Sequence, residues 1–127
     1  MKSLNRVFLM GHLGSNPELQ TSRGGRQYTR LNVATHRAWK DDEQERQERT
    51  DWHSVFVWGQ LAETCASYLT KGALVFVEGT LNQYESDASA GSSVTKQSIH
   101  AQSVRFLSRQ LDNPEVPRNH DAVVHLG

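Results

Sequence analysis

The sequence predicts a single all-β domain, a small closed barrel that includes one helix. Residues alternate with the period of two that is typical of strands in Arg6–Leu13, Tyr28–Trp39 and Asp51–Gly59. Helical spacing follows in Gln60–Thr70, and the chain then returns to β-forming residues in Ala73–Gly79. Glycines interrupt or flank several of these stretches, as expected where strands bend to close a barrel.

Between the first two long strands, Glu18–Ser22 is predicted to pair as a short strand, and Arg23–Arg26 forms a basic turn with two glycines. Asp41–Arg49 is highly charged and has no apolar anchor. We interpret it as a hairpin tip whose return strand starts at Thr50 or Asp51; a solvated helical turn is the alternative.

In the helical stretch, Leu61, Cys65, Tyr68 and Leu69 share one face, which predicts that they point into the core, and Gly72 marks the end. One cysteine excludes an internal disulfide framework and is typical of a reducing compartment.

The last part of the chain predicts a long hairpin. Leu81–Tyr84 continues a strand past Gly79, where a bulge is expected, and Ser86–Ser93 is small and polar, as in a mobile hairpin tip. Val94–Leu107 is the final strand, with a second irregularity expected near Gln102. Three strands, one helix and two strands give the order of the OB-fold, a five-stranded Greek-key barrel whose face and loops bind oligonucleotides. We assign residues 1–109 to this domain and 110–127 to a disordered tail.

Composition limits the classes of function. No run of 18 apolar residues exists, which predicts that no segment spans a membrane, and the apolar stretch near the N-terminus is too short for a secretory signal. The formal net charge is zero, but Lys40–Asp51 holds three basic and six acidic residues. The rest of the first 109 residues carries 10 basic and 5 acidic residues, a balance of about +5 that is compatible with nucleic acid as a partner.

The segment Asp51–Gly59 carries the strongest functional signal. As a strand it places Trp52, Ser54, Phe56 and Trp58 on one face, and His53, Val55 and Val57 on the other. Either both faces are buried and the aromatics belong to the core, or the aromatic side is a platform on which unpaired bases stack. Every base has a π-face, so such a platform binds single strands without regard to sequence.

Six segments together resemble bacterial single-stranded DNA-binding proteins, in matching order and spacing over about Leu4 to Arg109: Asn5–Glu18, Asn32–Thr35, Thr50–His53, Trp58–Glu63, Tyr68–Gly72 and Val77–Leu81. The resemblance implies an OB-fold that assembles as a homo-oligomer, most often a homotetramer. It also implies a bacterial, cytoplasmic and nucleoid-associated protein that coats single-stranded DNA in replication, recombination and repair.

The resemblance also implies roles for individual residues. Base stacking falls to Trp39, Trp52, Trp58 and Tyr84, with Phe56 on the same strand face, and His53 matches a histidine of the subunit interface. Our candidates for phosphate contacts are seven basic residues: Arg6, Arg23, Arg26, Arg30, Arg37, Lys40 and Lys71.

The sequence departs from the family pattern where the family has basic residues. Ser54, Gln60 and Thr70 stand at three such positions, and Leu81–Asp87 contains no Lys or Arg. Each lost phosphate contact lowers the salt dependence of binding, so we expect stacking to dominate. The acidic C-terminal tip with which family members dock partner proteins is also missing from the final residues.

Two alternatives stay open. A specialised paralogue, such as a primosome-type accessory protein, would keep the fold and act mainly through protein contacts. An enzyme is disfavoured, because the six histidines have no metal-ligand spacing and no phosphate loop, nucleophile elbow or calcium loop occurs. We therefore expect no catalysis, no cofactor and no metal.

Overall fold

The computed structural model describes residues 2–88 and 92–107, with side chains described outside 86–94. The expected tail at 110–127, the domain end at Arg109 and the centre of the expected hairpin tip at 89–91 lie outside the described residues. No helix among the described residues is long and apolar enough to cross a membrane.

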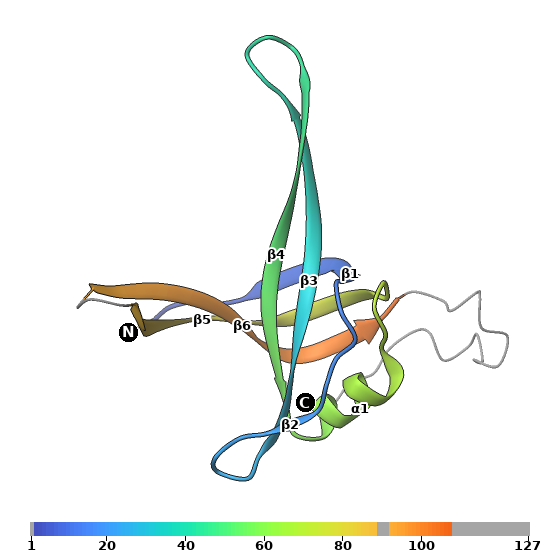
Figure 1. Cartoon of the computed structure of the whole chain (residues 1–127), viewed down its shortest axis with the longest axis vertical. Coiled ribbons are helices and arrows are strands. Elements are labelled where there is room, and N and C mark those ends of the chain that lie inside the picture. Colours follow the sequence, from blue (N-terminus) through green and yellow to red (C-terminus); the bar gives the residue numbers. More distant parts are fainter. Residues whose placement is uncertain (1, 89–91, 108–127) are drawn as a thin grey trace, which may run out of the picture.

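The described chain forms a five-stranded barrel with one extra short strand and one helix (Figure 1). The elements are β1 (Val7–Leu13), β2 (Gln20–Thr21), β3 (Gln27–Lys40), β4 (Arg46–Trp58), α1 (Gln60–Tyr68), β5 (Leu74–Ala88) and β6 (Ser92–Phe106). The sheet order is β1-β5-β6-β4-β3-β2, and a further β1–β3 pairing closes the barrel. The pairing of β4 with β6 is parallel, and the other strand pairs are antiparallel. This topology confirms the predicted OB-fold, with the helix between the third and fourth barrel strands.

The core fills the barrel with side chains from alternate positions of each strand and with one side of α1. Its buried apolar residues are Leu13, Leu31, Val33, Val55, Val57, Leu61, Ala62, Cys65, Leu69, Ala73, Val75, Val77, Ile99 and Val104. Cys65 is fully buried, as predicted. The prediction that Tyr68 points into the core is wrong, because 68% of this residue is exposed. Leu61, Cys65 and Leu69 already cover the barrel, and Tyr68 lies on the solvent side of the helix.

The β3–β4 hairpin extends far beyond the barrel as an arm (Figure 1). The predicted start of its return strand at Thr50 or Asp51 is wrong, because β4 begins at Arg46, which pairs with Lys40. The tip is short because the Asp41 carboxylate accepts hydrogen bonds from the backbone N–H groups of Glu43 and Glu45, both at 2.9 Å. Beyond the barrel a strand has no core to face, so its apolar alternation disappears while its backbone ladder continues.

The β5–β6 hairpin contains the predicted bulge. Glu78 pairs with Ser103 and Gly79 with Ala101, so Gln102 is the extra residue. A Cβ atom on Gly79 would collide with the carbonyl oxygen of His100, which explains the glycine at this crossing. The strands run to Ala88 and from Ser92, so the strands take up part of the expected tip at Ser86–Ser93.

Candidate nucleic-acid interface

The outer face of β4 presents the predicted aromatic row. Val55 and Val57 are fully buried on the inner face, whereas Trp52 is 62% exposed on the outer face. Phe56 and Trp58 are half-buried on the same outer face. The alternative in which both faces of this strand are buried is therefore wrong at Trp52.

Neighbouring strands widen this row into a surface. Tyr28 on β3 pairs with Trp58, and their ring centroids are 4.9 Å apart; its ring centroid lies 6.4 Å from that of Phe56. His100 on β6 pairs with Phe56, and its ring centroid is 6.4 Å from that of Trp58. We call the surface formed by Tyr28, Trp52, Phe56, Trp58 and His100 the aromatic face. Sequence reasoning missed Tyr28 and His100, although Tyr28 alternates in phase with Arg30 and Asn32.

The β5–β6 hairpin extends the aromatic face. Thr80 pairs with His100. Four residues closer to the end of the hairpin on each strand, Tyr84 pairs with Lys96. Four residues are two full periods of a strand, so Tyr84 and Lys96 lie on the same side of the hairpin as His100. Tyr84 is 46% exposed. Lys96 thus adds a cation to a hairpin whose first strand has none among Leu81–Asp87.

Trp39 does not join this surface. It alternates in phase with Leu31 and Val33, whereas the outer residues of β4 pair with Tyr28, Arg30 and Asn32. Trp39 is 45% exposed on the arm, and the guanidinium of Arg37 lies 5.5 Å from its ring centroid. The structure therefore places Trp39 and Trp52 on opposite faces of the same hairpin.

His53 lies on the core side of β4, as its alternation predicts. Its Nε2 atom is 2.9 Å from the hydroxyl of Thr35, which satisfies the ring in a partly buried position. A role at a subunit interface stays a prediction.

The predicted phosphate contacts fall into three groups. Arg26 and Arg30 border or belong to the aromatic face, since the Arg26 guanidinium lies 4.8 Å from the Trp58 ring centroid and Arg30 pairs with Phe56. Two others already have protein partners: Arg6 donates to the Gln102 side chain, and Arg37 donates to Asp51 at 2.7 Å. The remaining three, all exposed, are Arg23, Lys40 and Lys71.

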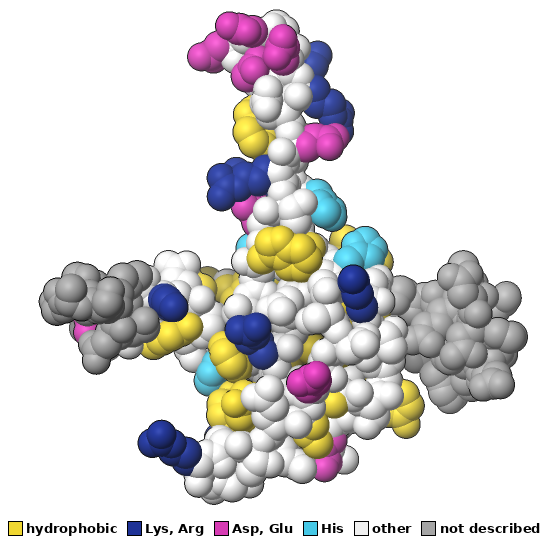
Figure 2. Space-filling view, viewed as in Figure 1, with side chains coloured by type: hydrophobic (Ala, Val, Ile, Leu, Met, Phe, Trp, Pro, Cys, Tyr) yellow, Lys and Arg dark blue, Asp and Glu magenta, His cyan; other side chains and the backbone are white. Residues whose placement is uncertain are grey.

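Acidic side chains are concentrated at one end of the molecule. Figure 2 shows several of them gathered at the end of the arm, with basic side chains beside and below them on the arm and others over the barrel. The acidic end is the tip Asp41–Glu45 together with its neighbours. By sequence, the formal net charge of zero combines −3 from Lys40–Asp51, +5 from the rest of the first 109 residues and −2 from residues 110–127.

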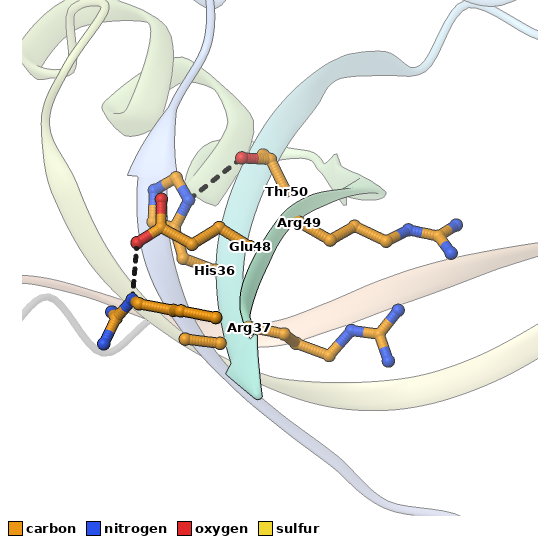
Figure 3. Close-up of a pocket in the computed structure, with 7 residues that line it drawn as sticks. His36, Arg37, Glu48, Arg49 and Thr50 are labelled. Atoms are coloured by element: carbon orange, nitrogen blue, oxygen red, sulfur yellow. Dashed lines mark hydrogen bonds and ion pairs between the residues drawn. The ribbon is translucent and has the colours of Figure 1, made fainter. Parts of the chain in front are cut away.

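A shallow hollow of about 490 Å³ lies on the arm (Figure 3). It is lined by His36, Arg37, Ala38, Arg46, Glu48, Arg49 and Thr50. Most of its charges are paired: Arg46 lies 3.1 Å from Glu48, and Arg37 and Arg49 share the carboxylate of Asp51. Among the described residues, no group of three or more His, Cys, Asp or Glu side chains could hold a metal ion.

Comparison with known proteins agrees with this geometry. Residues 4–107 match the single-strand binding protein family. Single-stranded DNA-binding protein 1 of Chlorobaculum tepidum is 42% identical over 80 residues, which cover 63% of this chain and 49% of that protein. The single-stranded DNA-binding protein of Neisseria meningitidis serogroup A is 35% identical over 111 residues, covering 87% of this chain and 64% of the relative. The chain thus spans between about half and two thirds of the length of these two relatives.

A solved structure supports the same assignment. The Plasmodium falciparum SSB complex with ssDNA superposes with a TM-score of 0.77 at 28% identity, over 85% of this chain and 98% of that chain. Each of these three proteins is described as binding single-stranded DNA or as complexed with it, and none as an enzyme. The chain belongs to the single-strand binding protein family.

Proposed function

We propose that this protein binds single-stranded DNA with little regard to sequence, through bases stacked on the aromatic face and on Tyr84. One observation carries the proposal: the exposed Trp52 and the half-buried Phe56 and Trp58 share the solvent side of a strand whose other side buries Val55 and Val57 completely. Stacking on an aromatic side chain contributes about 1–3 kcal/mol per base. Several stacked bases would compensate for the affinity that is lost because fewer basic residues contact the phosphates.

Phosphate contacts fall first to Arg30 and Arg26, which lie beside the rings, and to Lys96, which pairs with Tyr84. Arg37 is a weaker candidate, because a phosphate has to compete with Asp51 for its guanidinium. The pair is solvent-exposed on the arginine side and is worth about 0–1 kcal/mol, so this competition is feasible. Arg6, Arg23, Lys40 and Lys71 complete the proposed set.

We also propose that the chain works as a homo-oligomer, with a tetramer favoured. An apolar patch supports this: Phe8 is 63% exposed, Met10 is 56% exposed, and Phe76 lies beside both on the outer side of β1 and β5. Exposed apolar patches of this kind mark association surfaces. His53 as an interface residue, a role in replication, recombination and repair, and a location in the bacterial cytoplasm near the nucleoid belong to the same proposal.

The proposal is tested by comparing binding of a fluorescently labelled dT oligonucleotide to Trp52→Ala, Trp58→Ala and the parent. Each substitution should weaken binding by roughly 5- to 150-fold, the equivalent of one stacked base. Tyr68→Ala is the matched control, because Tyr68 is an exposed aromatic residue on α1 away from this face. Parent-like affinity in both tryptophan variants, with folded far-UV circular dichroism spectra, would refute the stacking platform.

A further inference from the structure

The Arg26 guanidinium covers a surface of Trp58 on which a base would stack. The Arg26 guanidinium lies 4.8 Å from the centroid of the Trp58 ring, within the range of a cation–π contact. A base that stacks on this face of the indole needs the volume that the guanidinium fills. Tyr28 packs against the same indole, with ring centroids 4.9 Å apart. The Arg26 side chain is therefore the part of this cluster that has to move.

The backbone of Arg26 is fixed while its side chain is not. Its carbonyl oxygen accepts a hydrogen bond from the N–H of Ser22 at 2.8 Å, and its own N–H donates to the Ser22 hydroxyl at 3.2 Å. The side chain is exposed, and no carboxylate within the described part of the chain lies within ion-pair distance of it. Its guanidinium can leave the ring without breaking an ion pair there.

We propose that Arg26 is a displaceable cap on Trp58: it covers the indole when DNA is absent and moves to a backbone phosphate when a base takes its place. A cation–π contact at an exposed site is weaker than a stacked base. The displaced guanidinium also gains a charge-assisted hydrogen bond to phosphate, an acceptor that matches the two-donor geometry of arginine. Both the contact to the Trp58 ring and the contact of the guanidinium therefore become more favourable when DNA binds. This inference rests on the single-strand binding proposed above.

The buried Trp58 Nε1 atom is consistent with such a cap, because it has no hydrogen-bond acceptor among the described residues. A buried polar group usually finds a partner. We expect the bound nucleotide, or water that enters with it, to supply the acceptor that this N–H lacks among the described residues. Because the same guanidinium leaves the ring and binds a phosphate, Arg26 couples base stacking on Trp58 to phosphate binding.

NMR spectroscopy of the Arg26 side chain tests the exchange directly. The indole ring current should shift the Arg26 Hδ and Hε resonances upfield of those of Arg23, an exposed arginine in the same turn. Saturation with a dT oligonucleotide should remove the upfield shift. An upfield shift that persists in the complex would show that Arg26 stays on the ring and would overturn the exchange. If the upfield shift is absent without DNA, Arg26 does not cover Trp58 and the cap is overturned. Failure of the parent to bind DNA would overturn the proposed function as well, while the DNA-free spectrum would still report on the cap.

The salt dependence of binding supplies a second readout. Arg26→Ala should lower the slope of log affinity against log salt by about 0.7, the contribution of one phosphate contact on a single strand. Its deficit relative to the parent should therefore shrink about fivefold over a tenfold rise in salt. Arg26→Lys, which keeps the charge, should retain the parent slope. An unchanged slope in Arg26→Ala would show that Arg26 never reaches a phosphate and would overturn the proposal.

Discussion

The indole ring of Trp52 lies against the backbone of Gly14, so closely that a Cβ atom at residue 14 would collide with the six-membered part of the ring. Trp52 is the most exposed of the three tryptophans on β3 and β4, so few other contacts fix its orientation. Gly14 follows β1, and its N–H donates to the carbonyl oxygen of Asn32 at 2.9 Å. The absence of a side chain at Gly14 thus leaves room for the Cζ3–Cη2 edge of the indole.

Gly14→Ala should displace the Trp52 ring and weaken binding of single-stranded DNA without unfolding the barrel. The loss should approach that of Trp52→Ala, up to one stacked base or about 1–3 kcal/mol. Gly24→Ala is the matched control, because a Cβ atom there meets nothing within 4 Å. Binding of a labelled dT oligonucleotide and the thermal midpoint are measured together; equal affinity for both alanine variants would contradict the role of Gly14.

Phe8→Glu should reduce the oligomeric state. Phe8 and Phe76 have ring centroids 6.3 Å apart in the proposed contact, so the substitution would place a carboxylate among the apolar side chains that association buries. Light scattering after size exclusion should give a smaller mass for Phe8→Glu than for the parent. Leu19→Glu, at another exposed apolar residue, should keep the parent mass. A parent-like mass for Phe8→Glu would place the association surface elsewhere.

The tip of the arm should loosen at acidic pH. A hydrogen bond from the backbone N–H of Glu45 is the main cause that lowers the pKa of the Asp41 carboxyl below 3.8. Burial opposes this shift, and hydrogen bonds from the backbone N–H of Glu43 and the side chain of Gln47 add to it. Stability from this carboxylate is therefore present above pH 3.8 and is lost as the pH falls through the lower folded-state pKa. Amide resonances of Glu43 and Glu45 should shift in that window. The same titration of Asp41→Asn should lack the transition; if the transition persists, another group causes it.

The thiol of Cys65 should be inert in the folded protein. Burial raises its pKa from 9.0 to about 12, so the thiolate that reacts with disulfide reagents is scarce at pH 8. Because the unfolded thiol ionises first, this group lowers the stability of the fold as the pH rises from 9 towards 12. Ellman's reagent should label the thiol slowly in buffer and rapidly in denaturant. Rapid labelling in buffer would contradict its burial.

Local patterns in the sequence predicted much of the fold. The alternation in Asp51–Gly59 correctly separated Val55 and Val57 from the outer aromatics, because a strand inside a barrel has one buried and one exposed side. The bulge could be predicted because Gly79 interrupts a β-forming run and the parity of the last strand changes near Gln102. The start of β4 could not be predicted, since the arm has solvent on both faces and its end depends on hydrogen bonds to Asp41.

The composition of the aromatic face depends on strand register, which a single sequence does not reveal. Tyr28 and His100 reach Trp58 from β3 and β6, at 30 and 42 residues along the chain from it. Lys96 becomes a neighbour of Tyr84 for the same reason. Trp39 lies on the other face of the arm from Trp52, although both are aromatic residues of one hairpin.

Tryptophan fluorescence during titration with a dT oligonucleotide, at low and at moderate salt, tests the central claim most directly. Stacked bases quench indole emission, so the account predicts strong quenching by the single strand, little by a duplex of the same length, and a shallow dependence on salt. Absence of quenching at low salt, or equal quenching by the duplex, would contradict binding by base stacking. The OB-fold would then remain, and a protein partner would become the better candidate for what this barrel binds.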